Sequence, residues 1–199
     1  MRKIILMMSV SVDGFIEGPN RELDWHMVDE ELHNHFNQEI SRMGTILEGR
    51  VTYELMARFW PTADTDPASI QLARERGLLR PMVEFARIWR DTPKVVFSRT
   101  LAHANWNATI VRDVVPEEIQ RLKVQPGGDI LLGAANLASI FVRHDLIDEY
   151  RIYVHPIVIG QGKPLFQPGQ MKINFRLAET RTFGNGVVLL RYERLLAAS

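Results

Sequence analysis

The feature that most restricts the fold is the order of apolar runs along the chain. Near-continuous apolar runs, beginning with residues 3–12, alternate with helical patterns through the first three quarters of the sequence. Strands that are apolar on both faces are typical of a sheet covered by helices on both sides. In the last quarter, two β-like runs flank Gly184-Asn185-Gly186, a signal for a tight antiparallel hairpin. We therefore predict a three-layer α/β fold, with a mostly parallel central sheet and antiparallel C-terminal strands.

The same patterns divide the chain into expected elements of a single domain, residues 1–199. Strands are expected at residues 3–12, 45–47, 94–97, 108–111, 129–132, 148–159, 173–183 and 187–195. Helices are expected at residues 27–41, 50–58, 68–76, 81–90, 116–124 and 135–143. Residues 59–93 have a looser pattern and include the loop PTADTDP. We interpret this segment as an insertion that could cover the pocket.

Composition excludes several classes of function. The chain has 24 Lys and Arg against 24 Asp and Glu, and this zero net charge argues against a nucleic-acid-binding protein. It has no cysteine, which rules out disulfides, thiolate metal sites and cysteine nucleophiles and fits a cytoplasmic protein. Asp13-Gly14 interrupts the first apolar run, so a buried strand is favoured over a signal peptide. No run approaches the roughly 20 residues of a membrane helix.

Three expected strand ends carry residues that suit a bound anion. Gly49, Arg50 and Thr52 stand where a strand becomes a helix, and a helix N-terminus attracts phosphate. An ordinary helix start with an exposed arginine would explain the same residues. A second strand end is followed by Ser98-Arg99-Thr100, whose hydroxyl and guanidinium groups suit an anionic ligand. A solvated polar loop is the alternative.

The third strand end reads Gly133-Ala134-Ala135-Asn136, where small residues permit close approach of a pyrophosphate. Tight packing between helix and strand is the alternative. Each signal is weak alone, but together they favour a phosphorylated dinucleotide. Arg99 then suits the ribose 2′-phosphate that distinguishes NADPH from NADH.

Metal binding is not expected. His33 and His35 are two residues apart and so point to different sides of a helix. Neither His-Glu-x-x-His nor a Cys/His cluster occurs in the sequence.

With these positions in view, the chain resembles the dihydrofolate-reductase-like family. That family includes the reductase domain of the bifunctional riboflavin-biosynthesis deaminase–reductase, and this chain is most similar to its stand-alone bacterial members. The resemblance extends from about residue 3 to residue 195. The matching segments are Ser11-Val12-Asp13-Gly14, Asp24-Trp25, Gly49-Arg50-x-Thr52-Tyr53, Phe97-Ser98-Arg99-Thr100, Gly127-Gly128-Asp129-Ile130-Leu131-Leu132-Gly133, Leu146-Ile147-Asp148-Glu149 and His155-Pro156-x-x-x-Gly160-x-Gly162-x-x-Leu165-Phe166.

The resemblance implies an NADPH-binding fold in which the three strand ends contact the cofactor. Gly133-Ala134 departs from the family's common double glycine, and alanine narrows the approach if this position needs a positive φ. The resemblance also implies a homodimer formed through the late antiparallel strands. The strand carrying Tyr150 and Tyr153 suits such an interface, but equally an internal core.

The resemblance also suggests residues near the substrate. Asp13 follows the first strand and is a candidate catalytic and substrate-binding carboxylate, or else it caps the Asp-Gly turn. Glu30 is a second catalytic candidate, although a solvated first-turn glutamate is the alternative. Trp25 is a candidate wall of the substrate pocket, or a loop anchor.

The implied function is NADPH-dependent reduction of a small heterocycle, similar to that of 5-amino-6-(5-phosphoribosylamino)uracil reductase in riboflavin biosynthesis. The absence of the deaminase signature, His-x-Glu with Pro-Cys-x-x-Cys, weakens that particular assignment. Dihydrofolate or pteridine reduction is a second possibility. A non-catalytic NADP-binding sensor module is a third.

Overall fold

The structure is a computed structural model that describes residues 1–167 and 172–195. Its strands are β1 (Ile4–Ser11), β2 (Phe15–Glu17), β3 (Thr45–Gly49), β4 (Lys94–Phe97), β5 (Ala108–Val111), β6 (Ile130–Leu132), β7 (Glu149–His155), β8 (Lys163–Pro164), β9 (Phe175–Thr182) and β10 (Val188–Arg194). Its helices are α1 (Glu30–Ile40), α2 (Arg50–Phe59), α3 (Pro67–Glu75), α4 (Leu79–Asp91), α5 (Pro116–Val124) and α6 (Ala135–Arg143).

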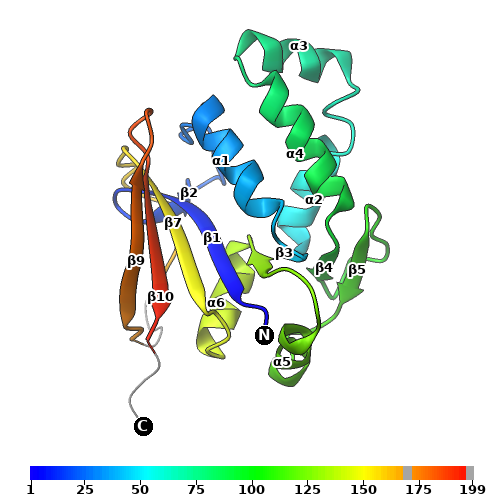
Figure 1. Cartoon of the computed structure of the whole chain (residues 1–199), viewed down its shortest axis with the longest axis vertical. Coiled ribbons are helices and arrows are strands. Elements are labelled where there is room, and N and C mark those ends of the chain that lie inside the picture. The colour runs from blue at the N-terminus through cyan, green and yellow to red at the C-terminus, as the bar shows by residue number, and fades with distance from the viewer. Residues whose placement is uncertain (168–171, 196–199) are drawn as a thin grey trace.

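Eight of the strands form one mixed sheet in the order β5-β4-β3-β6-β1-β7-β10-β9 (Figure 1). Every pair from β5 to β7 is parallel, whereas β10 runs antiparallel to both β7 and β9. The predicted α/β fold, with a mostly parallel sheet and antiparallel C-terminal strands, is therefore confirmed.

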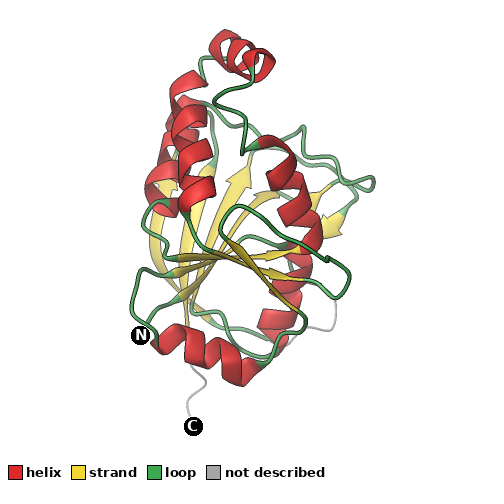
Figure 2. Ribbon diagram, turned by 90° about the vertical axis from the view of Figure 1, so that its right-hand side faces the viewer, coloured by secondary structure: helices red, strands yellow, loops and turns green. Residues whose placement is uncertain are grey.

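Helices cover both faces of this sheet because both faces are apolar. Neighbouring residues of its central strands point to opposite faces, and each set packs against helices. Ile4 and Leu132 belong to an apolar cluster with side chains of α5 and α6. Their neighbours Ile5 and Leu131 belong to another cluster, with side chains of α1, α2 and α4. The sheet lies between these two helical layers (Figure 2), which explains why its inner strands are apolar throughout.

Two details of the strands differ from the sequence-based expectation. The run expected as one strand at 148–159 ends at His155, where Pro156 follows and has no N–H group for a sheet hydrogen bond. The short antiparallel pair of β2 and β8 was not expected, because strands of three and two residues leave no readable periodicity.

The tyrosine-bearing strand lies inside the sheet. β7 is paired with β1 on one side and β10 on the other, and Tyr150 and Tyr153 are buried. Of the two interpretations of these tyrosines, the structure therefore favours the internal core. The edge strands of the sheet are β5 and β9.

The segment 59–93 contributes a helix to the main helical layer. Its helix α4 lies beside α1 (Figure 1) and buries Phe85 and Trp89 in the same cluster as Tyr53 of α2. Its first helix, α3, packs on α4 through a small cluster that includes Ala73 and Met82. Part of this segment is thus integral to the core, and its description as an insertion stays a prediction.

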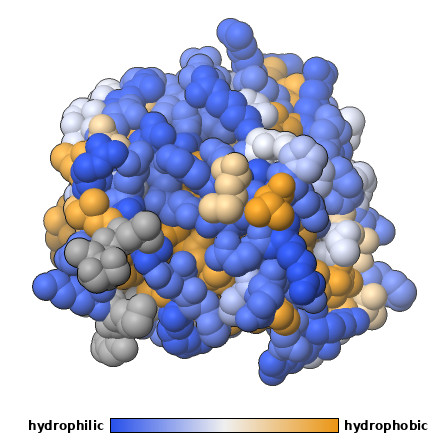
Figure 3. Space-filling model, turned by 60° about the horizontal axis from the view of Figure 1, so that its bottom comes forward, coloured by the Kyte–Doolittle hydropathy of each residue, from blue (hydrophilic) through white to orange (hydrophobic). Residues whose placement is uncertain are grey.

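The largest apolar clusters are enclosed between the layers. Figure 3 shows the end of the molecule from below, where the surface is mainly hydrophilic and its apolar residues form scattered patches. Val115, just before α5, and Val124, its last residue, are among the exposed apolar residues. Within the described part of the chain, no helix combines the length and apolar character needed to cross a bilayer.

Close packing at Gly162 leads to a stability prediction. This glycine has a φ of 150°, and an added Cβ would collide with the backbone carbonyl of Glu17 in β2. We expect Gly162→Ala to lower the free energy of unfolding by about 2 kcal/mol, measured by urea denaturation. Gly160→Ala is the matched control, because Gly160 also has a positive φ but open space around its Cβ position. Equal losses in the two variants would show that the collision contributes nothing.

Candidate functional site

The three anion-binding segments predicted from the sequence come together at one edge of the sheet. Gly49 at the end of β3 pairs with Phe97 at the end of β4, and Leu47 pairs with Leu132 at the end of β6. The loops that leave these parallel strands are therefore neighbours. Ligands of open α/β sheets bind at this carboxyl edge.

These loops border a groove of about 500 Å³, which we call the outer groove. Seven of the ten predicted cofactor-binding residues line it: Gly49, Arg50, Thr52, Ser98, Arg99, Ala134 and Asn136. An eighth, Gly133, lies in an adjoining pocket described below. Thr100 is not among the described lining residues of the outer groove, and the side chain of Ala135 lies outside the described part of the structure.

Two helices begin at the outer groove without a side chain capping them. The N-cap residues of α2 and α6 are Gly49 and Ala134, and neither makes a side-chain capping hydrogen bond. Ala134 has a φ of −132°, an extended conformation that any residue adopts, so alanine in place of a second glycine introduces no strain. Open space surrounds the Cβ positions of Gly49 and Gly133. These helix N-termini are therefore accessible to an anion.

Cations outnumber carboxylates along the outer groove. Its lining includes the side chains of Arg21, Arg50, Arg99, Arg112 and Lys163, against those of Glu17 and Asp113. Arg99 donates to Asp113 while remaining 80% exposed, and Arg50 donates to Glu54 at 2.8 Å across one turn of α2. Exposed ion pairs of this kind are weak, so both guanidinium groups remain available to a phosphorylated ligand.

A second cavity, of about 360 Å³, adjoins the outer groove, and we call it the inner pocket. Consecutive residues divide between the two spaces: Glu48 and Gly133 line the inner pocket, whereas Gly49 and Ala134 line the outer groove. Thr52 lines both. The two spaces therefore meet at the N-termini of α2 and α6.

The walls of the inner pocket are mainly apolar and come from both the sheet and the helices that cover it. They include Met7, Met8, Val28, Phe36, Ile40, Ile46, Met56, Trp60, Phe85, Trp89 and Leu131. Trp60, Phe85 and Trp89 come from the segment 59–93, so residues of this segment form part of the pocket wall. Such walls suit a small planar ligand.

Glu48 is the carboxylate of the inner pocket. Its side chain is buried, and its Oε2 has no hydrogen-bond partner within the described chain. Burial raises its pKa to about 7, against the opposing effects of the positive charge of Lys94 and of contact with the Trp89 indole. Glu48 therefore titrates close to neutral pH, which is a property of catalytic acids and bases.

The positive charge of Lys94 acts on this carboxylate, while its Nζ hydrogen-bonds to backbone carbonyls. Its Nζ donates to the carbonyl oxygens of Trp89, Thr92 (2.8 Å) and Trp106 (2.9 Å). Burial lowers its pKa to about 8, while the charges of Glu48 and Asp91 oppose that shift. Lys94 thus places a positive charge near Glu48, but its Nζ is not free to bind a molecule in the pocket.

Two histidines provide further polar atoms in the inner pocket. His26 Nε2 and His33 Nδ1 are buried and have no hydrogen-bond partner among the described residues. Burial lowers the pKa of each ring, so both are neutral at physiological pH. His33 also packs its ring edge to face against Trp60 and Phe85.

The structure does not bring the predicted catalytic carboxylates to this site. Asp13 is exposed and accepts hydrogen bonds from the backbone N–H groups of Ile159 (3.3 Å) and Gly160 (2.8 Å), which anchors a loop. A hydrogen bond with Ser11 is the main reason that its pKa is lowered, which makes it a poor proton donor. Glu30 is exposed in the first turn of α1. Neither residue is part of the lining of either space.

Trp25 also lies outside the described lining of both spaces. Its Nε1 donates to the carbonyl of Glu22 at 3.2 Å, and its ring packs edge to face on His26 and His155. The structure therefore supports the loop-anchor interpretation of Trp25. The residue in contact with both Trp25 and the inner pocket is His26.

Sequence analysis missed Glu48, although it lies between two segments that were examined closely. A charged residue inside the otherwise apolar run TILEG was the available signal, because a charge in a buried strand needs a reason. It also missed Arg21, Arg112 and Lys163 of the outer groove. Arg21 and Arg112 lie in separate loops and Lys163 in β8, and only the fold brings the three together.

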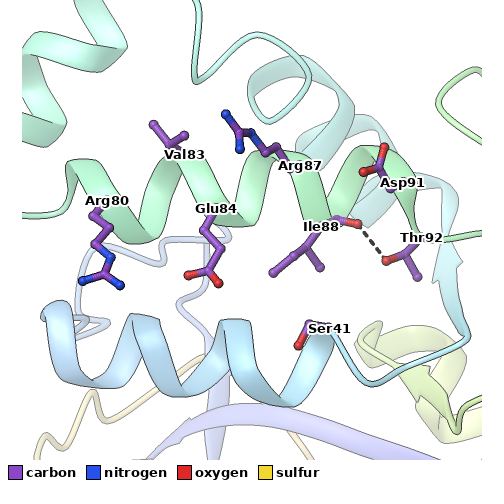
Figure 4. A pocket seen from close by; sticks show the side chains of 8 residues that line it. All are labelled: Ser41, Arg80, Val83, Glu84, Arg87, Ile88, Asp91 and Thr92. Carbon is purple, nitrogen blue, oxygen red and sulfur yellow. Dashed lines mark hydrogen bonds between the residues drawn. The ribbon is translucent and has the colours of Figure 1, made fainter.

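A third hollow lies between α1 and α4, away from this site. Figure 4 shows Arg80, Glu84 and Ile88 of α4 directed toward α1, with Ser41 at the end of that helix. Its charged residues are two arginines and two acids, and they come mainly from one helix. This hollow has neither the excess of cations nor the apolar walls of the other two. No group of three or more His, Asp or Glu in the described chain is placed to hold a metal ion.

The fold is dihydrofolate-reductase-like. Dihydrofolate reductase from Enterococcus faecalis, solved with NADP(H), superposes with a TM-score of 0.63 at 12% identity, covering 96% of each chain. A putative riboflavin biosynthesis protein from Shewanella sp. PV-4 superposes with a TM-score of 0.72 at 21% identity, covering 98% of this chain and all of the other.

Within that class, the chain belongs to the RibD C-terminal domain family, whose family model matches residues 2–189. It is also 37% identical to the uncharacterized protein YyaP of Bacillus subtilis over 192 residues, which cover 96% of this chain and 94% of YyaP. The family resemblance recognised from the sequence motifs is confirmed.

Proposed function

We propose that this protein is an NADPH-dependent reductase of a small nitrogen heterocycle. The observation that carries the proposal is the junction of the two spaces at Thr52. A groove with excess positive charge and two uncapped helix N-termini opens there into an apolar pocket that contains a titratable carboxylate. A dinucleotide needs the first environment for its phosphates, and hydride transfer needs the second.

The residues of the outer groove fit such a cofactor. The backbone N–H groups at the starts of α2 and α6 would bind the pyrophosphate, because no side chain in the described structure caps either helix. Arg50 would add a guanidinium group at the first of these helices. Arg99 would bind the 2′-phosphate, and Ser98 supports its loop by accepting hydrogen bonds from the backbone N–H groups of Thr100 and Leu101.

The bound cofactor would supply the hydride, and the protein would position the substrate and exclude water. The inner pocket would perform this second task through its apolar walls and its closely packed aromatic rings. Thr52, which lines both spaces, would lie beside the reacting atoms.

The lining of the inner pocket also bears on the substrate. No Lys or Arg is among its described lining residues, so a phosphate group would find no cationic partner inside it. This favours an unphosphorylated heterocycle over 5-amino-6-(5-phosphoribosylamino)uracil, unless the phosphoribosyl group extends outside the pocket. Pterins therefore belong in the substrate panel beside pyrimidines.

Arg99→Ala tests the cofactor assignment. We expect this variant to bind NADPH about tenfold to a hundredfold more weakly than the wild type, because a charge-assisted hydrogen bond to a phosphate is worth roughly 1.5–3 kcal/mol. NADH affinity should change little. The measurement is quenching of intrinsic tryptophan fluorescence by each nucleotide.

Arg50→Ala is the matched control for this experiment, because its guanidinium group also lines the outer groove in an exposed ion pair. It should weaken NADPH and NADH to a similar extent. Equal losses of both nucleotides in Arg99→Ala would refute its 2′-phosphate role. Binding of neither nucleotide by the wild type would refute the proposed function altogether. Binding without turnover on a pyrimidine, pterin and quinone panel would indicate a sensor module instead.

We also propose that the protein is a homodimer, as the family resemblance suggests. The sheet ends at β9, an eight-residue edge strand whose outer side pairs with no other described strand. Edge strands of this length readily pair with a second copy. Sedimentation equilibrium would give the oligomeric state directly.

A further inference from the structure

The inner pocket contains a buried carboxyl group with one oxygen atom unpaired among the described residues. Glu48 is 2% exposed, and its Oε2 is a buried oxygen without a hydrogen-bond partner in the described chain. Leaving a buried polar atom unpaired is unfavourable by about 1–3 kcal/mol, so its retention indicates a partner that arrives with the ligand. Glu48 lines the inner pocket, and the residue that follows it, Gly49, lines the outer groove.

We propose that Glu48 is the proton donor of the inner pocket, and that this pocket binds a planar heterocycle whose C=N nitrogen accepts a hydrogen bond from the Glu48 carboxyl group. This inference rests on the proposed reductase function. It replaces Asp13 and Glu30 with a carboxyl group that lines the pocket.

The reaction balances with one reductant. A hydride from the reduced nicotinamide dinucleotide forms a C–H bond at the carbon of the C=N group, and the π electron pair moves to the nitrogen. That nitrogen takes the proton of Glu48, forming an N–H bond and leaving a carboxylate. The substrate is reduced by two electrons, the dinucleotide is oxidised, and water reprotonates Glu48 after product leaves.

The other titratable groups around Glu48 are less suited to this role. The hydrogen-bonding capacity of Lys94 is taken up by three backbone carbonyls. The Tyr53 hydroxyl donates to the carbonyl of Asn105, and the Tyr153 hydroxyl is hydrogen-bonded to His35.

The two pocket histidines are neutral, because burial lowers the pKa of each ring. They would help orient a ligand as hydrogen-bond partners. Glu48 instead keeps its acid form populated near neutral pH.

The first test needs neither cofactor nor substrate. Infrared difference spectra across pH should show the C=O band of a protonated carboxyl group that disappears near neutral pH. Glu48→Gln should abolish this band, whereas Glu54→Gln should retain it, because Glu54 is an exposed glutamate of α2 paired with Arg50. Persistence of the band in Glu48→Gln, or its absence from the wild type, would overturn the proposal.

The second test measures recognition of the ring nitrogen. Quinoline and naphthalene have nearly the same shape, but only quinoline has a C=N nitrogen. Well below pH 7 the wild type should bind quinoline about tenfold more tightly than naphthalene, and well above pH 7 that preference should disappear. Glu48→Leu should remove the preference at every pH while retaining naphthalene binding. Equal binding of the two probes by the wild type at low pH would contradict the proposal.

NADPH binding by the wild type tests the function, whereas the infrared and quinoline results test Glu48 with no nucleotide present. Circular dichroism shows whether each variant is folded. If the Glu48 variants fail to fold, the infrared spectrum of the wild type still tests the proposal. Quinoline should shift the frequency of its carboxyl band, whereas naphthalene should not.

Discussion

Replacing Lys94 with alanine is expected to lower the free energy of unfolding by about 3–5 kcal/mol, which is among the largest effects of any single substitution in this chain. The side chain is buried and joins three separate carbonyls. Two of them, from Trp89 and Thr92, lie at the C-terminal end of α4, and the third, from Trp106, lies in the loop before β5. The variant would leave all three unpaired and would open a cavity under the Trp89 ring, whose centroid lies 4.3 Å from Nζ.

Lys94→Met separates the two contributions. Methionine fills most of the volume but donates no hydrogen bonds, so we expect a loss of about 2 kcal/mol, caused by the unpaired carbonyls. Urea denaturation of both variants measures the losses. A loss below about 1 kcal/mol in Lys94→Ala would show that water or a backbone shift satisfies these carbonyls.

The same substitution should also change the titration of Glu48. The positive charge of Lys94 lowers the pKa of Glu48, against the larger effect of burial. Lys94→Met removes this charge, so the pKa of Glu48 should rise above its present value of about 7. Infrared titration of the carboxyl band would detect the change.

The fold was predictable because its periodicities are strong. Pairs such as Ile4 and Ile5 point to opposite faces that are both covered, and the resulting continuous apolar run identifies a sheet between two helical layers. β2 and β8 were not predictable, since a pair such as Phe15 and Pro164 is set by the positions of distant loops.

The outer groove was largely predictable, because strand ends of a parallel sheet meet at one edge and the chain marks three of them with Gly49, Ser98 and Gly133. The inner pocket was not. Its walls come from elements that include β1, β3, β6, α1, α2 and α4, and no periodicity in the sequence shows which side chains of those elements leave a space between them. Carboxylates such as Asp13 were chosen for their family motif, but tertiary contacts turned that residue toward the backbone of Gly160.

The stability of the wild type should fall as pH rises from about 4.5 to about 7, through the contribution of Glu48. Its pKa is 4.5 in the unfolded chain and about 7 in the folded protein, so the folded state binds more protons within that window. The favourable contribution is fully present below about pH 4.5 and is lost as pH rises through about 7. The loss is at most about 3 kcal/mol, since each pKa unit corresponds to about 1.4 kcal/mol.

Glu48→Gln should lack this contribution, so its free energy of unfolding should not show this fall with pH. The difference, variant minus wild type, should therefore rise by up to about 3 kcal/mol as pH increases across the window. Urea denaturation at a series of pH values measures the difference, in which the contributions of distant groups cancel. The comparison stops at about pH 7, because Lys94, with a pKa of about 8, has lost half of its protons at about pH 8. Parallel curves for the two proteins would show that Glu48 has an ordinary pKa. A rising difference would mean that the fold sacrifices stability at neutral pH to keep an unpaired acid in its pocket, which is the pattern expected of a residue retained for function.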